Sequence, residues 1–159
     1  MKLRIRRFEE KDLTDLYTLL SDAEVMRYIE PPFSPEQTRA FLHKAGLSDP
    51  PLVYAVDEDD VFIGYVIYHD YDAGSREIGW ILKKDTWGKG YAKELTRLLV
   101  RRAKSEGKSA VIECAPEQAV SKHIALASGF AYVGRDHGCD VYQLEQGEGA
   151  VTPEPGQTE

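Results

Sequence analysis

One stretch, residues 77–103, constrains this chain most, because it reads as a strand, a glycine-rich turn and a helix in direct succession. Residues 77–82 are mostly apolar or aromatic, with two β-branched isoleucines, which is typical of a strand. From Tyr91 onward, apolar residues recur at three- and four-residue spacing, which predicts an amphipathic helix. The turn between them reads Trp87-Gly-Lys-Gly-Tyr-Ala92.

This turn predicts an anion site. The first four N–H groups of a helix have no intrahelical partner, so here they would point into the turn, which suits a phosphate or pyrophosphate. Residues 83–108 contain nine Lys or Arg and three acids, although the whole chain has a formal charge of −7. Alternatively, the basic residues of 97–104 are solvated helix residues, and Gly88 and Gly90 only end the strand.

Two familiar phosphate loops are excluded by the residues of the turn. The Walker loop requires a Gly-Lys-Ser/Thr end, which is absent, and the dinucleotide fingerprint requires a third glycine where Lys93 stands.

The turn resembles the acyl-CoA-binding signature of the GNAT N-acetyltransferase superfamily, Gln/Arg-x-x-Gly-x-Gly/Ala. Gly90 and Ala92 occupy the two small-residue positions, and Trp87 departs from Gln/Arg at the first. The variant Trp-Gly-Lys-Gly-Tyr-Ala resembles the branch of ribosomal-protein N-terminal acetyltransferases. A second motif, residues 116–130, resembles the loop and helix that end in Leu-Gly-Phe in the family, and the whole resemblance covers roughly residues 3–144.

The expected fold is the GNAT fold, which is of the α/β class (α+β by some schemes). It has a mixed central sheet of about seven strands, flanked by about four helices. The expected order of elements is β-α-α-β-β-β-α-β-α-β-β. The expected strands are residues 3–8, 52–57, 61–68, 77–82, 109–114, 132–133 and 141–144. The expected helices are residues 12–20 with a short continuation over 22–29, 35–45 after a capping box at Ser34, 91 to just before Gly107, and 118–128. Residues 69–75 are expected to form a turn.

Length and composition predict one domain over residues 1–145 and a disordered acidic tail over 146–159. No apolar run approaches the ~20 residues of a membrane span, and the charged start is not a signal peptide, so we expect a cytoplasmic protein without membrane contact. The two cysteines, Cys114 and Cys139, form no disulfide framework or metal-ligand spacing, and a reduced compartment is expected.

The resemblance implies acetyl-CoA as co-substrate. The backbone of Ile81, Leu82 and Lys83 would pair with the pantetheine arm. The pyrophosphate would be held by Gly88, Lys89, Gly90, Tyr91, Ala92 and Lys93. Gln118 stands where the family usually has an asparagine that bonds the cofactor.

At one catalytic position of the family, this chain lacks the usual residue. Ala125 stands where many members have a tyrosine that protonates the leaving thiolate, so that general acid is excluded here. Ser121, one turn earlier, is a candidate substitute or, alternatively, a helix cap.

An amine must lose a proton before it attacks a thioester, and a carboxylate is the usual base. Glu113 lies in an otherwise apolar segment, at the strand position that carries the base in some members of the resembled branch. Glu77 would face the same site if the strand at residues 77–82 and the strand at residues 109–114 splay apart. Alternatively, both are salt-bridge partners of basic residues, and the rate comes from positioning and from backbone N–H groups.

The first hypothesis is an enzyme that transfers an acetyl group directly from acetyl-CoA to a primary amine of a small molecule or peptide: a protein N-terminus, polyamine, amino acid or antibiotic amine. The alternative is a non-catalytic acyl-CoA-binding regulatory module. A nucleic-acid role is disfavoured because the cofactor explains the one basic stretch, and no metal is expected because the four histidines share no ligand spacing. Residues 25–33 would set acceptor specificity or, alternatively, belong to the core, and the chain would be a monomer or homodimer.

Overall fold

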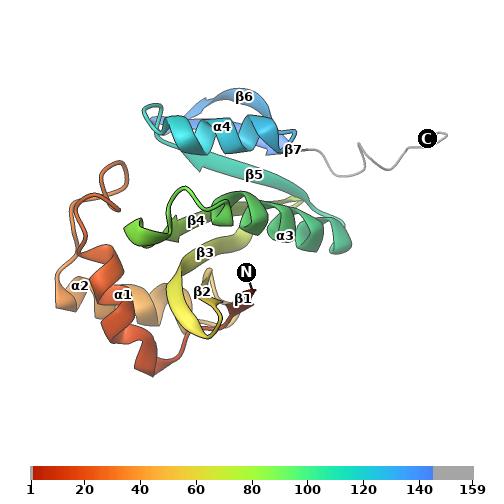
Figure 1. Ribbon diagram of the computed structural model, residues 1–159. Coiled ribbons are helices and arrows are strands. Elements are labelled where there is room, and N and C mark those ends of the chain that lie inside the picture. Colours follow the sequence, from red (N-terminus) through yellow and green to blue (C-terminus); the bar gives the residue numbers. More distant parts are fainter. Residues whose placement is uncertain (1, 145–159) are drawn as a thin grey trace. The chain divides into compact units, whose positions relative to one another are not determined.

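The computed structural model describes residues 2–144, so the predicted tail at 146–159 lies outside the described residues. Its strands and helices follow the expected order (Figure 1). The strands are β1 (Leu3–Arg6), β2 (Val53–Glu58), β3 (Val61–Asp72), β4 (Ser75–Leu82), β5 (Ser109–Cys114), β6 (Ala131–Asp136) and β7 (Cys139–Leu144). The helices are α1 (Leu13–Leu20), α2 (Pro35–Phe41), α3 (Tyr91–Ser105) and α4 (Ala119–Ala127). Short helical turns cover Glu10–Asp12, Leu42–Gly46 and Lys84–Thr86.

The seven strands form one mixed sheet in the order β1-β2-β3-β4-β5-β7-β6. Strands β4 and β5 are parallel, whereas β1–β2, β2–β3, β5–β7 and β6–β7 are antiparallel. The parallel pairing joins Ser75–Glu77 to Ser109–Val111, the first three residues of each strand. The expected fold class is therefore confirmed.

The described chain divides into two compact units. The first unit contains residues 2–69 and 79–92, and the second contains residues 70–78 and 93–144. In the first unit, α1 and α2 lie side by side. Its core consists of buried apolar side chains, among them Phe8, Leu16, Leu19, Leu20, Leu42, Val53, Ala55 and Tyr65.

Helix α2 begins at the capping box that the sequence predicts. The Ser34 hydroxyl oxygen accepts a hydrogen bond from the Gln37 N–H at 3.1 Å, and the Gln37 side-chain oxygen accepts one from the Ser34 N–H at 2.8 Å. Pro35 occupies the first helical position, where its missing N–H costs nothing. The helix continues as a π-helical turn over Leu42–Gly46, so the predicted span is confirmed.

Two local predictions are wrong. Residues 22–29 form hydrogen-bonded turns and no helix. The N–H groups of Arg27 and Ile29 bond carbonyls three residues earlier, and the Pro31-Pro32 pair that follows has no N–H groups with which to extend a helix. The predicted turn at 69–75 is shorter than expected, because β3 continues to Asp72 before reversing at residues 73–74.

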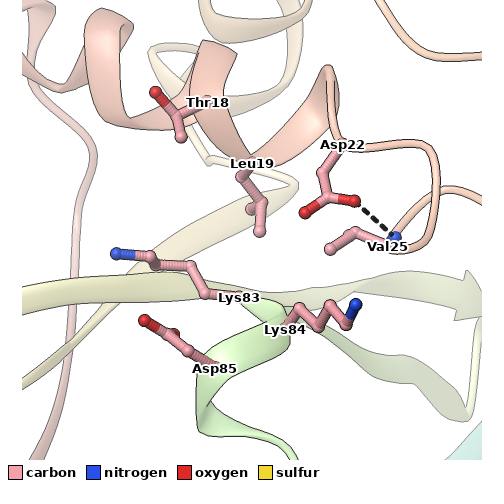
Figure 2. A pocket seen from close by; sticks show the side chains of 7 residues that line it. All are labelled: Thr18, Leu19, Asp22, Val25, Lys83, Lys84 and Asp85. Carbon is pink, nitrogen blue, oxygen red and sulfur yellow. Dashed lines mark hydrogen bonds between the residues drawn. The ribbon is translucent and has the colours of Figure 1, made fainter.

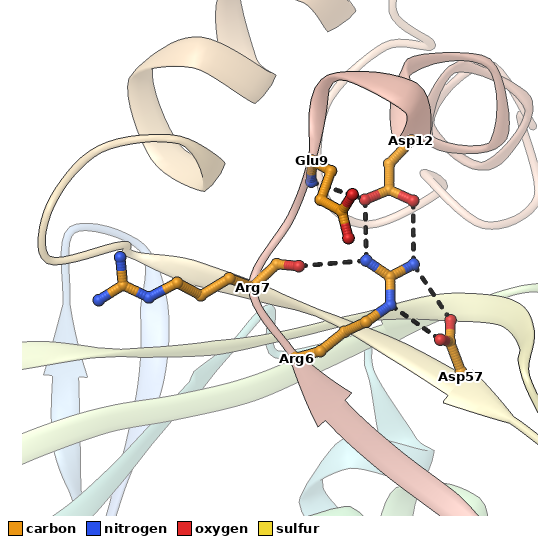
Figure 3. Close-up of polar contacts among 5 residues, drawn as sticks. All are labelled: Arg6, Arg7, Glu9, Asp12 and Asp57. Atoms are coloured by element: carbon orange, nitrogen blue, oxygen red, sulfur yellow. Dashed lines mark hydrogen bonds and ion pairs between the residues drawn. The ribbon is translucent and has the colours of Figure 1, made fainter.

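A buried ion network connects β1 to its neighbours in the first unit (Figure 3). The Arg6 guanidinium donates to both carboxylate oxygens of Asp12 at 2.9 Å and to Asp57 at 2.8 and 3.3 Å. The Asp12 carboxylate also accepts the Glu9 N–H at 2.8 Å. Burial opposes ionisation of Asp12, but the bonds from Arg6 and the Glu9 backbone outweigh it and lower its pKa. Arg6 therefore fixes the start of the chain through two charged partners.

Candidate active site

The glycine-rich turn lies in the first unit, between β4 and α3. Gly88 and Gly90 have φ values of +77° and +84°, in the left-handed region that favours glycine. A Cβ atom placed on either glycine would have no heavy atom within 4 Å, other than those of its chain neighbours. Helix α3 begins directly afterwards at Tyr91. The turn is therefore open at both glycines and leads into a helix N-terminus, as the sequence predicts.

Three side chains anchor this turn to the rest of the first unit. The Trp87 indole N–H donates to the Leu82 carbonyl at 3.0 Å, which folds the turn back onto the end of β4. The Tyr91 hydroxyl donates to the Glu58 carboxylate, and the Lys84 ammonium donates to the Glu24 carboxylate. The anchors come from β2, β4 and the segment after α1, so the turn is held from three directions.

The basic residues near the turn divide into two groups. Lys84 is paired with Glu24, and Arg97 is paired with Glu94 at 2.6 Å, a contact that lowers the Glu94 pKa. Lys89 and Lys93 are exposed, one within the turn and one in the first turn of α3. These two lysines are therefore the cations best placed to accompany an anion at the turn.

The backbone at the end of β4 is already partly engaged. The Lys83 N–H donates to the Ile63 carbonyl at 2.8 Å, and the Leu82 carbonyl accepts from Trp87. The Ile81 carbonyl lies so close to Gly64 that a Cβ there would approach it to 2.2 Å. The Leu82 carbonyl keeps a second lone pair, whereas the Lys83 N–H would have to leave Ile63 to bind a ligand.

A pocket of about 380 Å³ lies in the first unit beside this strand end. Figure 2 shows Leu19 and Val25 on one side of it, and Lys83, Lys84 and Asp85 on the other. Thr18 and Asp22 complete the lining. The pocket therefore combines an apolar side with charged groups of both signs.

In the second unit, the two candidate bases share one face of the sheet. Glu77 of β4 pairs with Val111 of β5, and residues directly opposite in a sheet point to the same side. Glu113 follows Val111 by two residues, so it points to that side as well. Glu113 is partly buried between the buried residues Ile112 and Cys114.

Sequence reasoning missed Tyr71, whose pKa is raised to about 12 by burial and by the negative charge of Glu113. Tyr71 belongs to the part of β3 that the sequence predicts as a turn. Tyr68 and Tyr71 are strand-forming residue types, but the point at which the strand ends depends on pairing with another strand.

Helix α4 carries the residues of the second motif. Gln118 is the N-cap residue, and its side-chain oxygen accepts the Ala115 N–H at 2.8 Å, which leaves its amide NH₂ available to donate. Ser121 is therefore the third residue of the helix, and its interpretation as the cap is wrong. Ala125, which stands where many family members have a tyrosine, is fully buried among its neighbours.

Within residues 2–144, the structure contains no group of three or more His, Cys, Asp or Glu side chains that could hold a metal ion. In the same range, no helix is both long enough and apolar enough to cross a bilayer. Cys114 and Cys139 are both free thiols.

Comparison with known proteins gives the family. A model of the acetyltransferase (GNAT) domain matches residues 2–131. The N-acetyltransferase YnaD of Bacillus subtilis (strain 168) is 30% identical over 138 residues, which cover 84% of this chain and 81% of YnaD.

Solved structures agree with this match. An acetyltransferase (GNAT family) from Bacillus anthracis is 28% identical, with a TM-score of 0.75 over 90% of this chain and 93% of its own. RimL, a ribosomal L7/L12 alpha-N-protein acetyltransferase in complex with coenzyme A, shares the fold at 17% identity, with a TM-score of 0.79 over 92% of this chain and 95% of its own. The chain therefore belongs to the GNAT family of acetyltransferases, and it is an acyltransferase.

Proposed function

We propose that this chain transfers an acetyl group directly from acetyl-CoA to a primary amine, with the cofactor held at the Gly88–Ala92 turn. The observation that carries the proposal is the open turn, whose two glycines have positive φ and lead directly into the N-terminus of α3. Backbone N–H groups at such a helix start bind phosphate without any side-chain cation. Lys89 and Lys93 add positive charge there, and the Gln118 amide is a further donor for the cofactor.

The end of β4 would hold the pantetheine arm through the free lone pair of the Leu82 carbonyl and neighbouring backbone of Ile81 and Lys83. When bound, acetyl-CoA supplies an acetyl group activated as a thioester. The protein itself contributes by holding the acetyl group in a fixed position relative to the attacking amine.

Glu113 is the preferred general base, and Glu77 on the same face is the alternative. Glu113 would take the proton that the amine nitrogen loses. The nitrogen lone pair then forms the C–N bond, the C–S bond breaks with its electron pair on sulfur, and Glu113 releases its proton to water. Ser121 is the candidate that passes a proton from water to the sulfur, in place of the tyrosine missing at Ala125.

The pocket beside β4 supports an acceptor with an aliphatic chain and an amine. Leu19 and Val25 offer apolar contact, and Asp22 and Asp85 offer negative charge beside the ammonium groups of Lys83 and Lys84, of which Lys84 is paired with Glu24. Val25 belongs to the segment expected to set acceptor specificity. RimL is named for acetylation of a protein α-amino group, so peptide N-termini stand beside polyamines, amino acids and antibiotic amines as acceptor classes.

A panel of these amines tests the proposal. The chain is incubated with acetyl-CoA and each amine in turn, and mass spectrometry detects the acetylated product. We expect at least one class to be acetylated. A non-catalytic acyl-CoA-binding module, which the alanine at position 125 favours, would bind acetyl-CoA and acetylate none of them.

A further inference from the structure

A buried carboxylate connects a helix and two strands of the second unit. Asp140 of β7 is only 3% exposed. Its Oδ1 accepts a hydrogen bond from the Arg135 guanidinium of β6 at 3.0 Å, and its Oδ2 lies 3.3 Å from the Lys122 ammonium of α4. Burial opposes ionisation of Asp140, but the contacts with Arg135 and Lys122 outweigh it and lower its pKa. The charged carboxylate therefore holds one cation from a neighbouring strand and one from the helix.

The two cations reach Asp140 from different surroundings. Arg135 pairs with Asp140 directly across the β6–β7 ladder, so the strand register sets its place. Lys122 also donates to the Pro116 carbonyl at 3.2 Å. Pro116 belongs to residues 115–118, which connect β5 to α4. Lys122 thus ties this connection to the buried carboxylate of β7.

The same connection is closed by Gln118. The Ala115 N–H donates to the Gln118 side-chain oxygen at 2.8 Å, and the Gln118 N–H donates to the Ala115 carbonyl at 3.0 Å. A side-chain amide is planar, so a bond that fixes its oxygen also fixes the direction in which its NH₂ group donates. The direction of the Gln118 donor therefore depends on the shape of the turn at 115–118.

We propose that Lys122 is a positioning residue for the cofactor: held by Asp140, its ammonium fixes the Pro116 carbonyl and with it the turn that directs the Gln118 amide. The inference rests on the proposed function, in which this amide donates to acetyl-CoA. Lys122 acts through Gln118 and not by contact with the cofactor. A donor that surrounding residues already hold in place loses less conformational freedom when a ligand binds.

The variant Lys122→Met tests this, because it removes the ammonium and keeps an aliphatic side chain over the helix. We expect acetyl-CoA to bind about threefold more weakly in calorimetry, within the range of one neutral hydrogen bond. In the free protein, NMR should show faster hydrogen exchange of the Ala115 amide, because its bond to Gln118 opens more often. Lys122→Arg retains a cationic donor and should restore both properties.

Arg135→Met is the matched control, because it removes the other cation of Asp140. It should lower the free energy of unfolding as much as Lys122→Met does, since each leaves the buried carboxylate with one partner fewer. Urea denaturation measures that loss. Unlike Lys122→Met, the control should keep the acetyl-CoA affinity and the Ala115 exchange rate of the unmodified protein.

Gln118→Ala separates this inference from the proposed function. We expect Gln118→Ala to weaken acetyl-CoA binding, and Lys122→Met/Gln118→Ala to bind no more weakly than Gln118→Ala alone. If Gln118→Ala weakens binding but Lys122→Met leaves affinity and exchange unchanged, or if Arg135→Met matches Lys122→Met in both, the positioning role is overturned and the proposed function stands. If the unmodified protein binds no acetyl-CoA, or Gln118→Ala binds it normally, the cofactor assignment fails and the role of Lys122 is overturned with it.

Discussion

The Tyr91 hydroxyl, on the first residue of α3, donates a hydrogen bond to the carboxylate of Glu58, at the end of β2. The two residues are 33 positions apart in the chain. This bond connects the N-terminus of the helix that follows the glycine turn to the β2–β3 hairpin. The position of the proposed phosphate site therefore depends in part on a bond to β2.

The variant Tyr91→Phe should weaken acetyl-CoA binding by about threefold, the scale of one modest hydrogen bond. The bond to Glu58, followed by burial, raises the pKa of Tyr91 to about 12. The donor is thus present at all pH values below that, so the loss should not vary with pH across the neutral range. Calorimetry with acetyl-CoA measures it. Tyr17→Phe, on the exposed side of α1, is the control, and an equal effect there would show that the Glu58 bond is irrelevant.

The variant Gly64→Ala should lower the free energy of unfolding by about 3 kcal/mol or more. A Cβ at position 64 would lie 2.2 Å from the Ile81 carbonyl oxygen, and φ there is +152°. Gly134 has a similar φ of +138° but open space around it, so Gly134→Ala isolates backbone strain and should cost about 1 kcal/mol. Urea denaturation compares the two, and equal losses would contradict close packing of β3 on β4.

The variant Asp12→Asn should destabilise the fold by about 3 kcal/mol at neutral pH, because it leaves Arg6 buried with one charged partner fewer. The folded-state pKa of Asp12 lies below its unfolded value, so its contribution is complete above the unfolded pKa of about 4 and is lost as pH falls through the folded pKa. Unfolding measured from pH 7 downward should show the gap between the two proteins closing in acid. Exposed Asp15→Asn is the control, and a gap that stays constant with pH would exclude the Arg6 pair as its source.

The variant that removes the true base should slow acetyl transfer ~10²–10⁴-fold without weakening acetyl-CoA binding. Glu113→Gln is expected to show this loss, and Glu77→Gln is the alternative on the same face. Exposed Glu117→Gln, four residues along the chain, serves as the matched control. Normal rates in both Glu113→Gln and Glu77→Gln would mean that positioning and backbone donors supply the catalysis.

Features that depend on neighbouring residues in the sequence could be predicted. The capping box at Ser34, the open turn at Gly88 and Gly90, and the start of α3 follow from local backbone preferences. The expected strands at 52–57 and 61–68 form the β2–β3 hairpin, whose turn residues Asp59 and Asp60 have φ values of 50° and 68°, as short hairpins require.

Features that depend on partners far along the chain could not be predicted. The length of β3, which places Tyr71 in a strand, is set by strand pairing. The shared face of Glu77 and Glu113 requires the register of β4 on β5, which no periodicity specifies. The hydrogen bond from the Trp87 indole to the Leu82 carbonyl depends on how the Trp87 side chain is oriented. This bond uses one of the two lone pairs that the Leu82 carbonyl could offer to a cofactor.

The central claim is that the turn at Gly88–Ala92 holds acetyl-CoA, and calorimetric titration of Gly90→Val with acetyl-CoA tests it most directly. A valine at φ +84° would disturb the turn and fill the open space before α3, so we predict binding at least tenfold weaker, about 1.4 kcal/mol. Gly107→Val is the matched control, because Gly107 has a φ of +74° and open space at the opposite end of α3. Unchanged affinity in a folded Gly90→Val protein, or an equal loss in Gly107→Val, would contradict the location of the cofactor.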